Sequence, residues 1–248
     1  MTVPSVEARQ AIERQFHDDR ARSRRTHDPH DFYAAGGLDD VWGAFLSQVG
    51  PLQGRTVLDF GCGEGWAAAE YARRGAVVHS FDISLESVRK VAGGRIRLAV
   101  MAGEYLGYRA NSFDLVLGVG ILHHTDLSLV SREVARVLRP GGRALFIEPL
   151  AHNPLLRAFR ALTPGRRTPT ERPMTMRQIR EFTRAFRCAH FRGYQLTSII
   201  PQGLLWATGN RSLFRTSLRV TEAIDGWLLS TVPPLHRYCW TSIIEVRR

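Results

Sequence analysis

The sequence has little cysteine, a single lysine and no long apolar run. Its three cysteines, Cys62, Cys188 and Cys239, are odd in number and far apart, so they predict neither a disulfide framework nor a metal site. No apolar stretch approaches the roughly 20 residues that cross a bilayer. The N-terminus, rich in Arg and Asp, lacks the apolar segment of a signal peptide. These absences favour a cytoplasmic protein.

Acidic residues are scarce in residues 151–248. There are 34 Lys and Arg residues against 23 Asp and Glu, a net charge of +11. Residues 1–150 are balanced, so the whole excess falls in residues 151–248. A basic region of this kind is typical of chains that bind nucleic acid, an acidic small molecule or a membrane surface. Because every basic residue except Lys90 is Arg, a genomic preference for arginine codons explains the excess equally well.

A glycine-rich turn in VLDFGCGEG, residues 57–65, organises the sequence. Residues 56–60 predict a short buried strand, and residues 66–74, which lack Pro and Gly, predict a helix. The turn between them has glycine at alternate positions, Gly61, Gly63 and Gly65. Glycine permits φ > 0 and lets backbone N–H groups come close to a ligand. Strand, glycine turn and helix together predict a nucleotide-type site at the carboxyl edge of a parallel sheet.

The spacing of the turn narrows the class of ligand. A dinucleotide fingerprint, G-x-G-x-x-G, requires its third glycine at position 66, where this chain has Trp66. Asp59, two residues before the first glycine, repels a pyrophosphate and attracts an ammonium or a sulfonium group. The turn therefore favours a cationic ligand over NAD.

This turn resembles motif I of the class I S-adenosylmethionine (SAM) dependent methyltransferases. The resemblance extends to Leu150 and includes SFDLVLGVGILHH at residues 112–124, which is similar to motif post-II, and the LRPGG turn at residues 138–142. It implies an α/β fold, a doubly wound seven-stranded Rossmann-like sheet with a helical lid and a substrate insertion, and SAM as cofactor. The alternation of strands and helices up to Leu150 agrees with a doubly wound sheet.

The resemblance also implies which residues bind SAM. Asp82 ends the second predicted strand, 23 residues after Asp59, where a carboxylate accepts the hydroxyls of a ribose. Ala102 stands where the family usually has an Asp that binds adenine, so that role falls to backbone groups of Ala102 and Gly103, helped by Glu104. The predicted set is Asp59, Gly61, Cys62, Gly63, Gly65, Asp82, Ile83, Ala102, Gly103, Glu104, Gly118 and Val119.

Three titratable side chains are expected at the same edge. His123 and His124 follow the fourth predicted strand, and Glu148 ends the fifth. Methyl transfer to an O–H or N–H acceptor needs alignment and removal of a proton, and imidazole is a base suited to neutral pH. In similar O-methyltransferases a His-His pair and a strand-five acid do the acid/base work, so the resemblance implies catalytic roles here. A structural cap is the competing interpretation of the histidines.

We predict three segments in a chain long enough to bury one sizeable core. Residues 1–50 hold two N-terminal helices with apolar stripes. The first is expected to form a lid over the SAM site, and the second either belongs to this lid or packs on the sheet. Residues 51–150 form the SAM-binding Rossmann-like core. Residues 151–248 form a basic substrate-side insertion plus the last two core strands, expected at residues 191–200 and 238–246. The stripe of the first helix consists of Ala8, Ala11, Ile12 and Phe16.

These observations predict a methyltransferase acting on a hydroxyl or amine of a small-molecule acceptor, such as a secondary metabolite, a sugar or a lipid-like or quinone-like compound. The alternative is an RNA (tRNA) methyltransferase that uses the basic residues 151–248, although no RNA-binding module is visible. A third interpretation is a SAM-binding protein with a degenerate site, which Ala102 favours. Arginines on a helix near residues 211–219 also suit contact with a membrane surface. No DNA partner is expected, and the sequence leaves the oligomeric state open.

Overall fold

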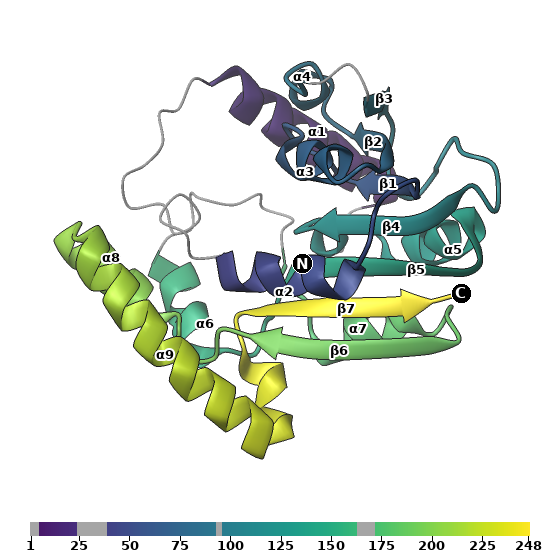
Figure 1. The fold of residues 1–248 in the computed structure, drawn as a ribbon. Coiled ribbons are helices and arrows are strands. Elements are labelled where there is room, and N and C mark those ends of the chain that lie inside the picture. Colours follow the sequence, from purple (N-terminus) through teal and green to yellow (C-terminus); the bar gives the residue numbers. More distant parts are fainter. Residues whose placement is uncertain (1–4, 24–38, 93–95, 163–171) are drawn as a thin grey trace.

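A seven-stranded sheet with strand order β3-β2-β1-β4-β5-β7-β6 forms the centre of the molecule (Figure 1). The computed structural model describes residues 5–23, 39–92, 96–162 and 172–248. The strands are β1 (Thr56–Phe60), β2 (Val77–Asp82), β3 (Ile96–Val100), β4 (Phe113–Val119), β5 (Leu138–Pro149), β6 (Cys188–Tyr194) and β7 (Thr241–Arg247). Strands β3, β2, β1, β4 and β5 pair in parallel, whereas β7 is antiparallel to both β5 and β6. The predicted α/β fold with a doubly wound seven-stranded sheet is confirmed.

Helices cover both faces of the sheet. The helical elements are α1 (Val6–Arg22), α2 (Asp39–Val49), α3 (Trp66–Arg73), α4 (Leu85–Val88), η1 (Leu122–His124), α5 (Leu127–Val137), α6 (Pro154–Leu162), α7 (Met176–Thr183), α8 (Ile200–Thr208), α9 (Arg211–Thr231) and η3 (Pro233–Tyr238). On one face residues of α2 and α3 share a hydrophobic core with Val57, and on the other residues of α5 and α7 share a second core with Leu58. Alternate residues of β1 thus enter opposite cores, as expected for a strand buried on both faces.

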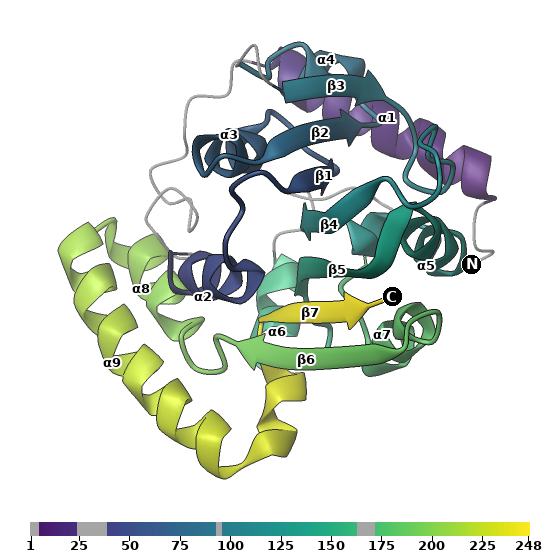
Figure 2. The same cartoon turned by 45° about the vertical axis from the view of Figure 1, so that its right-hand side comes forward.

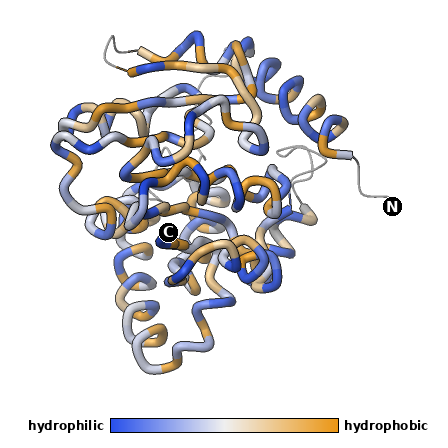
Figure 3. Tube along the Cα trace, turned by 90° about the vertical axis from the view of Figure 1, so that its right-hand side faces the viewer, coloured by the Kyte–Doolittle hydropathy of each residue, from blue (hydrophilic) through white to orange (hydrophobic). Residues whose placement is uncertain are grey.

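The buried residues of helix α1 include a carboxylate, that of Glu13. The helix packs beside α4 at the carboxyl edge of the sheet (Figure 2). Many residues along its trace are hydrophilic (Figure 3). Its buried residues are Glu13 and Ala21, while Ile12 of the predicted apolar stripe is exposed. The helix is confirmed, and most of its predicted apolar stripe is exposed, with Phe16 half-buried.

The strand predicted at residues 191–200 is shifted. It ends at Tyr194, because Gln195 has a φ of +66° and turns the chain out of the sheet. Asp225 of α9 then accepts the backbone N–H groups of Leu196 and Thr197, both at 2.8 Å. This contact fixes the α8–α9 hairpin against the end of β6. None of the helices in the described ranges is long and apolar enough to cross a membrane.

Parts of the predicted segments lie outside the described residues. These are residues 1–4 and 24–38 of the predicted lid, residues 93–95 of the predicted core and residues 163–171 of the predicted insertion. In the described part, α2 packs on the sheet and α1 lies at its carboxyl edge. The division into lid, core and insertion stays a prediction.

Candidate active site

The turn after β1 depends on glycine for two different reasons. Gly61, Gly63 and Gly65 have φ values of +75°, +51° and +85°, in the left-handed region that favours glycine. A Cβ on Gly61 would lie 2.5 Å from Ile121 Cγ1, and a Cβ on Gly65 would lie 2.5 Å from Val91 Cγ1. A Cβ on Gly63 would meet nothing within 4 Å in the described structure. Gly61 and Gly65 are therefore fixed by packing, whereas the backbone at Gly63 faces open space.

Substitution of Gly65 by Ala is expected to lower the free energy of unfolding by about 2–4 kcal/mol, since left-handed backbone strain and overpacking against Val91 add together. Gly43→Ala in α2 is the matched control, because its Cβ would meet nothing within 4 Å in the described structure. It is expected to raise stability by about 0.5–1 kcal/mol. Urea unfolding of the two variants measures both values, and equal stability of the two would contradict this description of the turn.

Two buried carboxyl groups lie beside this turn. Asp82, at the end of β2, accepts the N–H of Gly63 at 2.8 Å and the N–H of Ser84 at 2.9 Å. Asp59 is 2% exposed and accepts the hydroxyl of Ser80 at 3.2 Å. Burial, together with a smaller effect of the nearby Asp82 carboxylate, raises the pKa of Asp59 to about 7. A cationic ligand would stabilise the charges of two buried acids as close as Asp59 and Asp82.

The thiol of Cys62 lies close enough to the same two acids to feel their charge. It is buried, and the Cys62 N–H donates to the carbonyl of Phe81 at 2.8 Å. Burial, together with the charges of Asp59 and Asp82, raises the pKa of the thiol. Cys62 therefore stays protonated and serves as a small residue of the turn rather than a nucleophile.

In the loop after β3, the polar side chain of Glu104 makes its hydrogen bonds inside the protein. Glu104 is buried and accepts the N–H of Asp126 and the side-chain amide of Gln10, both at 3.0 Å. A Cβ on Gly103 would lie 2.5 Å from Phe60 Cζ, so packing against this ring requires glycine there. Ala102 is half-buried beside it. Glu104 thus joins the loop to α1 and to the start of α5.

Strand β4 also needs a glycine, Gly118, where a side chain of β5 packs closely against it. A Cβ on Gly118 would lie 2.7 Å from Cδ1 of Phe146, a residue of β5. Val119, which ends β4, is half-buried, as is Ile83 just after β2. The predicted residues Ile83, Gly118 and Val119 therefore all lie at the carboxyl ends of β2 and β4, the two strands that flank β1.

Glu148 and His123 form a hydrogen-bonded pair. Glu148 lies in β5, is fully buried, and its Oε2 is 2.7 Å from Nδ1 of His123. The other oxygen accepts the N–H groups of Ile121 and Leu122 at 2.9 and 2.7 Å. Glu148 thereby fixes both the η1 backbone and the imidazole of His123. With Nδ1–H donated to the carboxylate, Nε2 of His123 carries the lone pair of a base.

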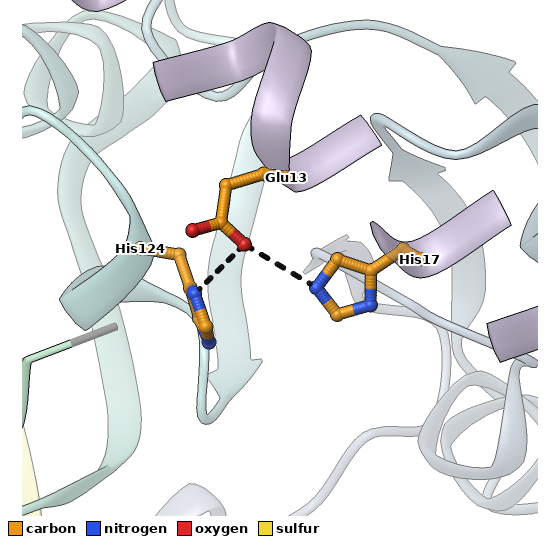
Figure 4. Close-up of side chains that lie close together, drawn as sticks. All are labelled: Glu13, His17 and His124. Atoms are coloured by element: carbon orange, nitrogen blue, oxygen red, sulfur yellow. Dashed lines mark ion pairs between the residues drawn. The ribbon is translucent and has the colours of Figure 1, made fainter. Parts of the chain in front are cut away.

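His124 contacts a different acid. Its Nδ1 lies 3.1 Å from Oε2 of Glu13 in α1, and Nε2 of His17 lies 3.6 Å from the same oxygen (Figure 4). The imidazole rings of His123 and His124 are 4.1 Å apart between centroids. The two adjacent histidines therefore have separate carboxylate partners, one in the sheet and one in α1.

Polar contacts join α1 to several strand ends. Gln10 binds Glu104, and Asp18 accepts the hydroxyl of Ser84 at 2.6 Å. The hydrogen bond from Ser84 also lowers the pKa of Asp18. With the contact between Glu13 and His124, α1 reaches the loops after β2, β3 and β4.

The sequence predicts α1 as a lid helix but not the contacts of its polar side chains. Glu13 contacts His124 and Asp18 contacts Ser84, both at the carboxyl edge of the sheet. His17 contacts Glu13. The available signal was the i,i+4 spacing of Glu13 and His17, which puts two titratable groups on one helix face. Nothing in the sequence linked that face to His124.

A family model described as a methyltransferase domain matches residues 58–146. Among curated proteins, a demethylmenaquinone methyltransferase of Corynebacterium kroppenstedtii is 33% identical over 117 residues, which cover 46% of this chain and 50% of the relative. An aklanonic acid methyltransferase of a Streptomyces species is 38% identical over 111 residues, which cover 40% of this chain and 50% of the relative. The chain thus spans about half the length of these curated relatives.

The whole described fold also has solved counterparts. A geranyl diphosphate C-methyltransferase from Streptomyces coelicolor, solved with Mg²⁺, geranyl diphosphate and S-adenosyl-L-homocysteine, superposes with a TM-score of 0.60 at 16% identity. The match covers 99% of this chain and 100% of that one. At this level of identity the match is evidence for the fold.

Proposed function

Since this chain belongs to the class I SAM-dependent methyltransferases, we propose that it transfers a methyl group from SAM to a hydroxyl or amine of a small molecule. Relatives named for demethylmenaquinone and for aklanonic acid support a quinone-like compound or a secondary metabolite as acceptor. A sugar or a lipid-like acceptor belongs to the same proposal. The observation that carries it is the coincidence of two acids, an open glycine turn and a carboxylate-oriented imidazole at one edge of the sheet.

The turn and its two acids fit SAM. Open space at Gly63 leaves room for a ligand against the backbone, and Asp82 has the position at the end of β2 from which a carboxylate accepts ribose hydroxyls. Asp59 offers a negative charge to the ammonium and sulfonium groups. When bound, SAM supplies a methyl group already activated by the sulfonium. The remaining proposed cofactor residues are Gly61, Cys62, Gly65, Ile83, Ala102, Gly103, Glu104, Gly118 and Val119.

Binding of SAM is expected to release a proton from Asp59. The free carboxyl group, with its pKa of about 7, is partly protonated at neutral pH, and a cation beside it favours the ionised form. Affinity for SAM should therefore rise as the pH increases from about 6 to about 8, by up to tenfold per pH unit below the pKa. Calorimetric titration in two buffers of different ionisation enthalpy measures the released proton.

Asp59→Asn is the control for this linkage. The amide does not titrate, so SAM affinity should lose its pH dependence in this variant. The same raised pKa makes Asp59 a destabilising group of the free protein, whose cost grows from about pH 4 to pH 7 as the unfolded carboxyl ionises and the folded one does not. Proton uptake on binding, or an unchanged pH dependence in Asp59→Asn, would contradict a role for Asp59 beside a cation.

The chemistry of the chain's own residues is proton removal and alignment. His123 Nε2 takes the proton of the acceptor O–H or N–H, and Glu148 holds the ring by the 2.7 Å contact with Nδ1 and stabilises the imidazolium that forms. Glu148 is fully buried, which makes it a positioning residue rather than a ligand for the acceptor. His124, whose ring lies 4.1 Å from that of His123, is then a wall of the same site.

The experiment is a search for an acceptor with mass-spectrometric detection of methylated product and S-adenosylhomocysteine. The panel contains hydroxylated quinones, aromatic polyketide acids, sugars, lipid-like phenols and bulk tRNA. We expect transfer to a small molecule and loss of transfer in Asp82→Ala. Methylation of tRNA alone would overturn the small-molecule proposal, and no binding of SAM would overturn the activity altogether.

A second candidate, RNA methylation, rests on the charge of residues 151–248. Arg211, Arg215 and Arg219 lie along one side of α9 and line a shallow surface depression. If this side bound RNA, the logarithm of the binding constant would fall linearly with that of the salt concentration, and Arg215→Ala would reduce the slope. A flat salt dependence would remove this candidate.

A further inference from the structure

A carboxylate and two imidazoles of the chain converge outside the pair formed by His123 and Glu148. Glu13 and His17 come from α1, and His124 comes from η1 (Figure 4). One donor atom from each of the three side chains lies within 4.8 Å of the donor atoms of the other two. We call these three side chains the α1 cluster. It joins two elements that are more than 100 residues apart in sequence.

We propose that the α1 cluster binds a divalent transition-metal ion of the Zn²⁺ type. Zn²⁺ is bound by imidazole nitrogen and carboxylate oxygen at about 2.0–2.2 Å, which sets tetrahedral ligands about 3.4 Å apart. Oε2 of Glu13 is 3.1 Å from Nδ1 of His124 and 3.6 Å from Nε2 of His17, on either side of that value. Two imidazoles disfavour Mg²⁺ and Ca²⁺, which take oxygen ligands.

Local structure explains why these donors meet. Glu13 and His17 are one helical turn apart, so their side chains lie on the same face of α1. The η1 backbone before His124 is held by the N–H groups of Ile121 and Leu122, which donate to Glu148. Both sides of the cluster are therefore supported by secondary structure, as a metal site requires.

The exposed fractions of the three side chains fit a metal site that keeps one coordination position open. The side chain of Glu13 is 5% exposed, that of His124 12% and that of His17 32%. The two inner donors are thus largely shielded from water, while His17 is free enough to rotate toward a metal. Three protein ligands leave a fourth position for water or another oxygen, as in zinc sites that are not fully closed.

The bound metal would tie α1 to the carboxyl edge of the sheet. In the described structure α1 is joined there by polar contacts such as the one between Asp18 and Ser84 at 2.6 Å. A metal would link the helix to η1, next to His123. This inference is independent of methyl transfer, because binding can be measured without SAM or acceptor.

The test is titration of the full-length, tag-free, chelator-treated protein with ZnCl₂ by calorimetry, with bound zinc counted by plasma mass spectrometry after desalting. We expect one Zn²⁺ per chain. Glu13→Gln and His17→Ala should each weaken binding by about 10–100-fold or more. Co²⁺ in place of Zn²⁺ should give the visible absorption of a low-symmetry N/O site, and that absorption should be lost in both variants.

Two controls separate the α1 cluster from general surface binding. Asp19→Asn alters an exposed acid of the same helix, which accepts from Gln15 at 2.8 Å one turn away. His190→Ala removes an exposed imidazole on β6. Both should keep one tight Zn²⁺, and circular dichroism should show the same helix content in all four variants. Absence of bound zinc in the unaltered chain, or full binding by folded Glu13→Gln or His17→Ala, would overturn the proposal.

Discussion

Replacement of His123 by Gln is expected to lower kcat for methyl transfer by about 10²–10⁴-fold, the usual contribution of a general base. Gln cannot accept a proton at neutral pH, although it occupies a similar volume. The affinity for SAM should stay unchanged, because His123 is proposed to act on the acceptor. The measurement is single-turnover transfer to the acceptor found in the panel, together with calorimetric SAM binding.

His79→Gln is the matched control for this loss. His79 is a half-buried histidine in β2 whose Nε2 lies 3.0 Å from Arg97, away from the carboxyl edge. It should retain the unaltered rate. Glu148→Gln should show an intermediate loss, because its amide oxygen can still accept from Ile121 and Leu122 while the charge that stabilises His123 is removed. Unaltered kcat in His123→Gln would exclude His123 as the base.

Replacement of Asp82 by Ala is expected to weaken SAM binding by about 30–1,000-fold. Two ribose hydroxyls donated to a carboxylate are worth about 1–2 kcal/mol each, and every 1.4 kcal/mol is a factor of ten in affinity. The carboxylate also accepts the N–H groups of Gly63 and Ser84, so its loss relaxes the turn as well. Calorimetric titration with SAM and with S-adenosylhomocysteine measures the change.

Asp114→Ala is the control for that substitution. Asp114 lies in β4 near its amino end and also accepts a backbone N–H, that of Thr56 at 2.8 Å, but at the opposite edge of the sheet. Its loss should lower stability without changing SAM affinity. If both variants lowered the affinity equally, the effect of Asp82→Ala would reflect unfolding rather than contact with the ribose.

The sequence predicted the core of this fold because its signals are local. Glycines at alternate positions after β1 need left-handed backbone, and each shows it in the structure. Asp59 lies near the end of β1, and Asp82 is the last residue of β2. Because parallel strands end at the same edge of the sheet, the sequence could place the two acids together. Topology therefore brought these residues together without knowledge of any side-chain contact.

The remaining contacts could not be predicted because they join distant segments through polar groups. The contacts of the two Glu104 oxygens with Gln10 and Asp126, for example, join a loop to α1 and to the start of α5. The buried side of α1 carries Glu13, which a hydropathy pattern assigns to solvent. The end of β6 depends on Gln195 adopting positive φ, which a β-rich sequence pattern does not reveal.

Calorimetric titration of the full chain with SAM tests the central proposition most directly. We predict saturable binding of one SAM per chain, with proton release near neutral pH and no heat of binding from NAD. Binding of NAD in place of SAM, or no saturable uptake of SAM by the folded chain, would contradict the account.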